Sequence, residues 1–192
     1  MTVTFWFDPS CPFTWRTARW LRATAAARGE AVRWRLMSLG VLNAGKDVPE
    51  QYRVPMRQAQ LVLRVLAATE AQHGSHGLDA VYTALGTRVH EQEQPLDRAT
   101  VEAALGEAGL PGALLAAYDD EEQDAAVRAS HDEAQRRVGQ EAGSPVVAVG
   151  AGPGFFGPIV TTVPTGPAAD RLYEALRLVS EVDGFSELKR AR

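Results

Sequence analysis

A single cysteine marks the point where the first strand of this chain gives way to its first helix. Residues 3–28 read VTFWFDPSCPFTWRTARWLRATAAAR, and Cys11 is the only cysteine among 192 residues. β-Branched and aromatic residues fill positions 3–7, which is typical of a strand. Pro12 suits the first turn of a helix, and apolar residues recur at helical spacing after it. The sequence therefore predicts a strand, a sharp turn and a helix with Cys11 at its N-terminus.

This position favours chemistry at the Cys11 sulfur. Free backbone N–H groups and the positive end of the helix dipole stabilise a thiolate more than a thiol. The thiolate is the form of cysteine that acts as a nucleophile. A lone cysteine is often a small buried apolar residue instead. Its place between a strand end and a proline-initiated helix favours a functional thiol here.

Composition narrows the class of protein. Hydrophobic residues make up 45% of the chain, which is enough for one sizeable core, and the net charge of −4 argues against a nucleic-acid binder. No apolar run reaches the roughly 18 residues of a membrane span. The N-terminus lacks the features of a signal peptide, and a single cysteine cannot form an internal disulfide. We expect a cytoplasmic protein with no membrane or nucleic-acid partner.

Strand and helix patterns continue to the end of the chain. Beyond the first helix, strands are predicted over 31–42, 143–150 and 155–162, the first parallel to the opening strand and the last antiparallel to its neighbour. Helices are predicted over about 55–73, 78–91, 98–108, 113–118, 121–141 and 167–181. The chain thus divides into an N-terminal βαβ part at 1–48, a helical insertion at 49–120 and a C-terminal part at 121–192.

The turn at Cys11 resembles the active-site turn of the DsbA-like branch of the thioredoxin superfamily. The stretch FWFDPSCPFTW is similar to the FWFDP-x-C-P-W-C-W of the actinobacterial mycothiol-dependent reductases of the nitroreductase type. Cys11, Pro12 and Phe13 occupy the matching positions, and Thr14 replaces the second, resolving cysteine. The similarity continues through M-S-L-x-x-L-N and the final G-F-S-E-L-K-R-A-R. It implies an α/β thioredoxin fold, with a four-stranded mixed sheet and an all-helical insertion, that forms homodimers.

The resemblance also implies the outline of a site. Asn43 and Tyr52 fall on positions that line the family's substrate pocket, together with Phe13. Ser144 and Pro145 fall on the cis-proline loop, which faces the active-site cysteine and would supply backbone contacts to a thiol cofactor. From the residue pattern alone, Asn43 suits a turn and Tyr52 suits the surface.

The histidines and the glycine-rich segment are candidates for a metal site, a partner for Cys11 and a nucleotide-binding loop. The four histidines lack the spacing of a zinc site, so no metal is expected. A catalytic dyad would require His90 or His131 to approach Cys11 in space. His131 matches a histidine of the family's S-H motif but equally suits a helix surface. Residues 150–154 lack the strand–helix context of a dinucleotide loop, so no nucleotide cofactor is expected.

Thr14 decides which thiol mechanisms remain. It cannot form the internal disulfide that a resolving cysteine forms, but its hydroxyl could hydrogen-bond the Cys11 thiolate. With Pro12 shaping the helix start, these residues predict a thiol oxidoreductase. It would use a low-molecular-weight thiol, mycothiol by resemblance, to reduce a small electrophilic or disulfide substrate, and a redoxin is a candidate partner. The alternatives are a transferase or isomerase of the kappa-class glutathione transferase or 2-hydroxychromene-2-carboxylate isomerase type, and a non-catalytic ligand-binding protein.

Overall fold

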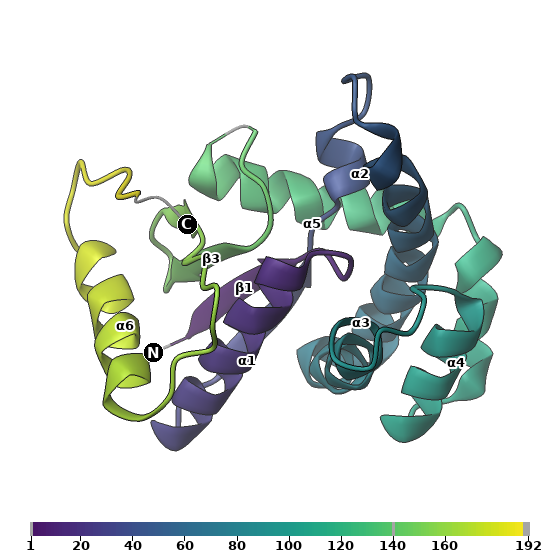
Figure 1. The fold of residues 1–192 in the computed structure, drawn as a ribbon, viewed down its shortest axis with the longest axis horizontal. Helices are drawn as coiled ribbons and strands as arrows, with labels where there is room; N and C mark the ends of the chain where they lie inside the picture. The colour runs from purple at the N-terminus through teal and green to yellow at the C-terminus, as the bar shows by residue number, and fades with distance from the viewer. Residues whose placement is uncertain (1, 140, 190–192) are drawn as a thin grey trace.

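The computed structural model describes residues 2–139 and 141–189 of the chain. The elements, shown in Figure 1, follow in the order β1 (Val3–Phe7), α1 (Pro12–Ala27), β2 (Val32–Leu36), α2 (Leu39–Leu42), α3 (Glu50–His90), α4 (Arg98–Glu107), the 3-10 helix η1 (Gly112–Asp119), α5 (Gln123–Val138), β3 (Val146–Val149), β4 (Gly154–Phe156) and α6 (Gly166–Val179). Two predictions reach outside the described residues: the helix over 121–141 includes residue 140, and the family-like C-terminal tail includes 190–192.

The strands form one mixed sheet in the order β2-β1-β3-β4. β1 and β2 run parallel, with Val3 opposite Val32, and α1 connects them as predicted. β1 runs antiparallel to β3, with Phe5 opposite Val147, and β3 runs antiparallel to β4. The structure therefore confirms the predicted four-stranded mixed sheet and its parallel N-terminal βαβ unit.

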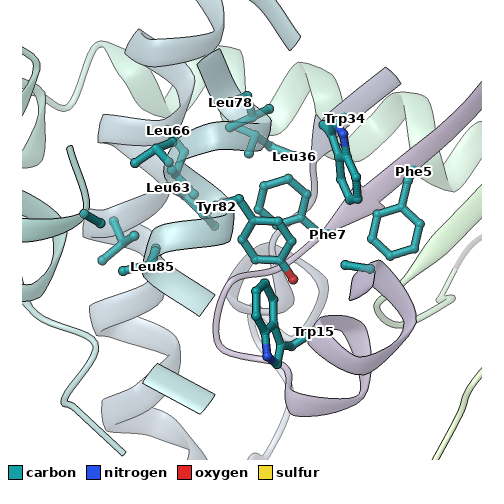
Figure 2. Close-up of a cluster of buried hydrophobic side chains, with 14 of the residues drawn as sticks. Phe5, Phe7, Trp15, Trp34, Leu36, Leu63, Leu66, Leu78, Tyr82 and Leu85 are labelled. Carbon is teal, nitrogen blue, oxygen red and sulfur yellow. The ribbon is translucent and has the colours of Figure 1, made fainter. Parts of the chain in front are cut away.

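The alternation of side chains along β1 divides the core between the two faces of the sheet. Phe5 and Phe7 belong to the large cluster that includes residues of α1, α3 and α6, whereas Trp6 packs on the other face with Ala134 of α5. Figure 2 shows the large cluster, in which the Phe7 ring stacks on Tyr82 with centroids 3.7 Å apart. This stacking fixes α3 against the end of β1, where the Cys11 turn begins.

Helix α3 is interrupted where the sequence predicted two helices. Gly74 has φ 65° and ψ −169°, a conformation that breaks the helical path and that glycine adopts without steric cost. The first half begins at Glu50, however, not near the predicted start at Pro55. The carboxylate of Glu50 lies in the first turn, where the helix dipole favours a negative charge. Residues 50–54, which lie before the predicted helix start, are therefore helical as well.

Two predicted strands are shorter in the structure. The strand predicted over 31–42 ends at Leu36, because Ser38 caps α2 by accepting a 3.1 Å hydrogen bond from the Val41 N–H. The strand predicted over 155–162 ends at Phe156. Pro158 follows two positions later and has no N–H to donate to a neighbouring strand. Local capping and proline chemistry thus override the apolar pattern at both ends.

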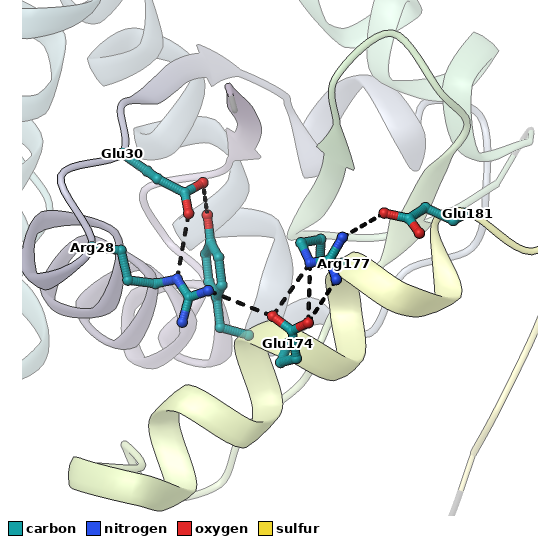
Figure 3. Close-up of polar contacts among 6 residues, drawn as sticks. Arg28, Glu30, Glu174, Arg177 and Glu181 are labelled. Atoms are coloured by element: carbon teal, nitrogen blue, oxygen red, sulfur yellow. Dashed lines mark hydrogen bonds and ion pairs between the residues drawn. The ribbon is translucent and has the colours of Figure 1, made fainter.

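Helix α6 is fixed against the end of α1 and the turn that follows it. Figure 3 shows the surface part of this contact, a network of ion pairs and hydrogen bonds that includes Arg28, Glu30, Glu174, Arg177 and Glu181. Exposed ion pairs of this kind contribute little individually. On the buried side of the contact, Trp20 Nε1 of α1 donates a 3.1 Å hydrogen bond to the Ala169 carbonyl oxygen of α6.

Candidate active site

Cys11 lies at the N-cap of α1, as the sequence predicted. Its backbone is extended, with φ −87° and ψ 114°, and Pro12 is the first residue of the helix. The Cys11 N–H donates a 3.2 Å hydrogen bond to the Asp8 carbonyl oxygen, and the Cys11 carbonyl oxygen accepts a 3.1 Å bond from the Trp15 N–H. The first bond closes the tight turn after β1, and the second begins the helix. The residue is partly exposed at this position.

The loop before β3 brings Ser144 and Pro145 to the Cys11 sulfur. The Ser144–Pro145 peptide bond is cis. The sulfur lies 3.6 Å from the Ser144 carbonyl oxygen, which accepts a hydrogen bond from the thiol. Pro145 directly precedes β3, which pairs with β1. The strand pairing therefore holds this loop beside the helix start that carries the cysteine.

Thr14 is fully buried beneath the same loop. Its hydroxyl donates a 2.8 Å hydrogen bond to Ser144 Oγ, and the Asp8 N–H donates a 2.9 Å bond to the same oxygen. The sequence-based expectation placed the Thr14 hydroxyl on the Cys11 sulfur. The structure directs it to Ser144 instead, because that oxygen lies within reach of the first turn of α1. The Thr14 hydroxyl therefore hydrogen-bonds the loop that faces the cysteine.

No role was predicted for Asp8 from the sequence. The carboxylate is completely buried. Oδ1 accepts hydrogen bonds of 2.8 and 2.6 Å from the backbone N–H and hydroxyl of Ser10, and Oδ2 accepts a 2.7 Å bond from the Leu39 N–H. Burial raises the pKa of Asp8, and these donated bonds oppose the rise. The sequence did carry a signal for this role: an acidic residue directly follows the apolar first strand and precedes the lone cysteine by three positions.

The two histidines considered from the sequence contact the site's supporting segments. His90 Nε2 lies 2.9 Å from the Pro9 carbonyl oxygen, and its ring stacks on Trp15. His131 is buried on α5, where Nδ1 accepts a 3.4 Å hydrogen bond from the Ser38 N–H. Burial lowers the pKa of both imidazoles. Among the contacts of the described residues, neither histidine hydrogen-bonds Cys11.

The remaining predicted residues are not gathered in one place. Phe13 is half-buried, with the Arg16 guanidinium 5.4 Å from its ring centroid. Asn43 lines a pocket of about 590 Å³ formed by α2, the loop after it and the N-terminal turns of α3 and α5. Tyr52 is 51% exposed on the first turn of α3 and does not line this pocket. The structure thus brings Thr14, Ser144 and Pro145 to Cys11 but leaves Tyr52 at the surface.

Within residues 2–139 and 141–189, no three His, Cys, Asp or Glu side chains are grouped so that they could hold a metal ion. No helix within the same ranges is long and apolar enough to cross a membrane.

Comparisons with known proteins show which family the chain resembles along its length. The model of a family described as Rv2466c-like, mycothiol-dependent nitroreductase Rv2466c, matches residues 10–190. The uncharacterized protein Rv2286c of Mycobacterium tuberculosis is 32% identical over 195 residues, a match that covers 100% of this chain and 82% of that protein.

Solved structures show the fold. The Streptomyces coelicolor protein SCO1869, described as a probable DsbA oxidoreductase, superimposes with a TM-score of 0.62 at 20% identity over 100% of this chain and 94% of that one. A 2-hydroxychromene-2-carboxylate isomerase gives a TM-score of 0.66 at 16% identity over 93% of this chain and 94% of that one. These similarities confirm the predicted DsbA-like thioredoxin fold.

Proposed function

The chain belongs to the Rv2466c-like family of mycothiol-dependent nitroreductases, and from this membership we propose that it is a cytoplasmic, single-cysteine thiol oxidoreductase that uses mycothiol to reduce a small electrophilic or disulfide substrate. The observation that carries the proposal is the position of the Cys11 sulfur. The sulfur belongs to a partly exposed residue at the N-terminus of a 16-residue helix, and it lies beside the cis Ser144–Pro145 bond. The helix dipole and the free N–H groups of the first turn favour a negative charge at this position.

The proposed reaction needs only one protein thiol. Cys11 and a first mycothiol together supply two electrons, the substrate takes up these electrons and two protons, and Cys11 is left in a mixed disulfide with mycothiol. A second thiol, from mycothiol or a redoxin, then forms a disulfide with the mycothiol sulfur, and Cys11 leaves as the thiolate. Two thiols are consumed for each substrate reduced. Thr14 takes no part in the electron transfer, because a hydroxyl cannot replace a resolving cysteine.

The chain's own residues have simpler tasks in this scheme. Asp8 hydrogen-bonds Ser10 within the turn, and its N–H donates to Ser144, so these bonds fix the turn and the cis-proline loop beside the sulfur. When Cys11 forms the mixed disulfide, it loses the S–H group that now donates to the Ser144 carbonyl oxygen. That oxygen then becomes free to accept a hydrogen bond from an amide N–H of the bound thiol compound. The proposed cofactor contact is therefore made by backbone, as the sequence resemblance implied.

A thiol transferase or isomerase is the second candidate, and the replacement of the resolving cysteine by Thr14 is the observation that favours it. A transferase or isomerase needs an activated thiol but no internal disulfide. The two candidates differ in stoichiometry, because a reductase consumes two thiols per product and an isomerase consumes none. A transferase incorporates one thiol into its product and forms no disulfide.

The test is to incubate the protein with mycothiol and a model disulfide or nitroarene, and to count the thiols lost per molecule of product. We expect two thiols lost per two-electron reduction, and a Cys11–mycothiol adduct detectable by mass spectrometry. Cys11→Ser should abolish both signals, while Ser186→Ala, which changes an exposed hydroxyl, should leave them intact. Product formation that survives in Cys11→Ser would refute the proposed nucleophile, and product formed without disulfide would favour the transferase or isomerase.

A further inference from the structure

The pocket that contains Asn43 is strongly basic. Its walls carry four cationic side chains and one acidic one, although the chain as a whole has a net charge of −4. The cations are Lys46, Arg53, Arg57 and Arg128. Between them, the pocket is lined by apolar side chains such as Val41 and Met56. A concave site of about 590 Å³ with an apolar lining and cationic groups has the size and character of a site for a small organic molecule.

The acidic residue of the pocket is paired mainly with a residue outside it, and of the four cations only Arg128 adds a weaker electrostatic attraction to its charge. Asp124 is paired with Arg64, whose Nε and terminal nitrogen donate hydrogen bonds of 2.8 Å to the two carboxylate oxygens. Gln60 Nε2 donates a further 2.8 Å bond to Asp124. The hydrogen bonds from Arg64 are the main reason that the pKa of Asp124 is lowered. Arg64 is not a lining residue, so the charge of Asp124 is balanced from outside the pocket.

Two of the four cations are free to bind a ligand. Arg57 and Arg128 form no hydrogen bond or ion pair with another residue of the described ranges 2–139 and 141–189. By contrast, Arg53 contacts Asp47 and Lys46 contacts Glu141. Arg57 comes from α3 and Arg128 from α5, so the two guanidinium groups reach the pocket from different helices. A planar guanidinium can bind a carboxylate or phosphate with two parallel hydrogen bonds.

We propose that this pocket binds the carboxylate or phosphate group of a small, partly apolar organic anion through Arg57 and Arg128, and that this anion is the substrate reduced at Cys11. The second half of the proposal rests on the proposed function. Mycothiol carries neither a carboxylate nor a phosphate, so the charge of the pocket suits the other reactant. The apolar lining between the cations accommodates the body of the molecule.

The pocket shares helix α2 with the segment that supports the cysteine turn. Helix α2 supplies one wall of the pocket through Gly40 and Val41. The same helix begins at Leu39, whose N–H donates to the buried carboxylate of Asp8. Asp8 in turn closes the turn that positions Cys11. Figure 1 shows α2 next to the loop between β1 and α1. A molecule in the pocket therefore contacts the element that supports the cysteine turn.

The binding test uses isothermal titration with three probes of similar shape: benzoate, phenyl phosphate and the uncharged benzamide. We expect at least one anion to bind the intact protein, more weakly at high salt because the arginines are exposed, and benzamide not to bind.

Arg57→Gln and Arg128→Gln should each weaken binding about tenfold, the loss of one charge-assisted hydrogen bond. Arg136→Gln, on the same helix as Arg128 but outside the pocket lining, should bind as the intact protein does. The preferred anion distinguishes carboxylate from phosphate recognition. Absence of binding by both anions, or equal binding by all variants, would overturn the proposal.

A second arm separates this proposal from the proposed function. Repeating the titrations on Cys11→Ser removes the nucleophile and leaves the pocket intact, so anion binding should persist there. In turnover, 4-nitrobenzoate should have a lower KM than 4-nitrobenzamide, and Arg57→Gln should remove that preference while leaving the amide's KM unchanged. Anion binding without any preference in turnover would overturn the assignment of the anion as substrate. If the anion binds Cys11→Ser but the intact protein shows no turnover, the reductase function is refuted while the anion-binding site stands.

Discussion

The Thr14 hydroxyl donates a 2.8 Å hydrogen bond to Ser144 Oγ, and this bond joins the first helix to the cis-proline loop. The same serine oxygen accepts the Asp8 N–H. One hydroxyl group therefore connects the end of β1, the start of α1 and the loop before β3. All three residues are buried, so water cannot replace either bond.

Ser144→Ala should destabilise the protein by about 2 kcal/mol, because it leaves two buried donors without an acceptor. The free energy of unfolding in urea measures the effect. Ser186→Ala removes a hydroxyl that is exposed in the structure and should change stability by less than about 0.5 kcal/mol. Equal stability of the two variants would mean that the hydrogen bonds at Ser144 contribute nothing net.

Thr14→Cys should create a disulfide with Cys11. The two residues are three positions apart at the start of α1, where side chains on one helical face are about 5–6 Å apart at Cβ, close enough for a disulfide after small adjustment. After mild oxidation, titration with a thiol reagent should find no free thiol. Thr24→Cys, near the other end of the same helix, should keep both thiols free. Two titratable thiols in oxidised Thr14→Cys would show that the helix start cannot accommodate the bond.

Gly86→Ala should destabilise the fold by roughly 1–3 kcal/mol through overpacking. A Cβ atom at Gly86 would lie 2.3 Å from the ring of Trp15, which leaves no room for a methyl group where α3 crosses α1. Gly106→Ala is the matched control, because nothing lies within 4 Å of the added atom in α4. It should stabilise the helix by up to about 1 kcal/mol. Thermal unfolding should show a lower melting temperature for Gly86→Ala and an unchanged or higher one for Gly106→Ala. A stabilised Gly86→Ala would contradict the close contact with Trp15.

Stability should fall as the pH drops below neutral, in part through His90. Burial lowers the pKa of His90 below its ordinary value of 6.5. As the pH falls, the unfolded chain binds this proton before the folded chain does, so the stabilisation is complete above 6.5 and is lost on the way down to the folded-state pKa. His90→Gln should therefore give a shallower dependence of unfolding free energy on pH, measured in urea from about pH 8 to about pH 5. The pKa of His131 is lowered as well, so His131→Gln is measured in parallel to separate the contributions of the two histidines. An unchanged slope in His90→Gln would exclude its contribution.

The sequence predicted the elements whose signals are local. The alternation over 3–7 and the Cys-Pro junction specify β1, α1 and the place of Cys11, because a strand period, a turn and a helix start are read from neighbouring residues. The ends of later elements were less predictable. They depend on a cap at Ser38 and on a proline at 158, which compete with an apolar pattern that continues past them.

The site was predictable only where family resemblance supplied long-range information. The approach of Ser144 to Cys11 was expected on that basis, and it follows from the pairing of β1 with β3. The bond between Asp8 and Leu39 and the redirected hydroxyl of Thr14 were not expected. Both depend on where separate segments meet in three dimensions, and a single sequence carries no signal for that.

The short distance between Cys11 and Ser144 has a consequence for synthesis of the protein. The cysteine leaves the ribosome earlier than its carbonyl partner, which lies 133 positions later in the chain. A nascent chain therefore carries this thiol through the synthesis of those residues, with neither the cis-proline loop nor β3 beside it. The surroundings of the sulfur are complete only once both segments have been made and paired with β1, so its reactivity toward alkylating reagents reports whether a given molecule has finished folding.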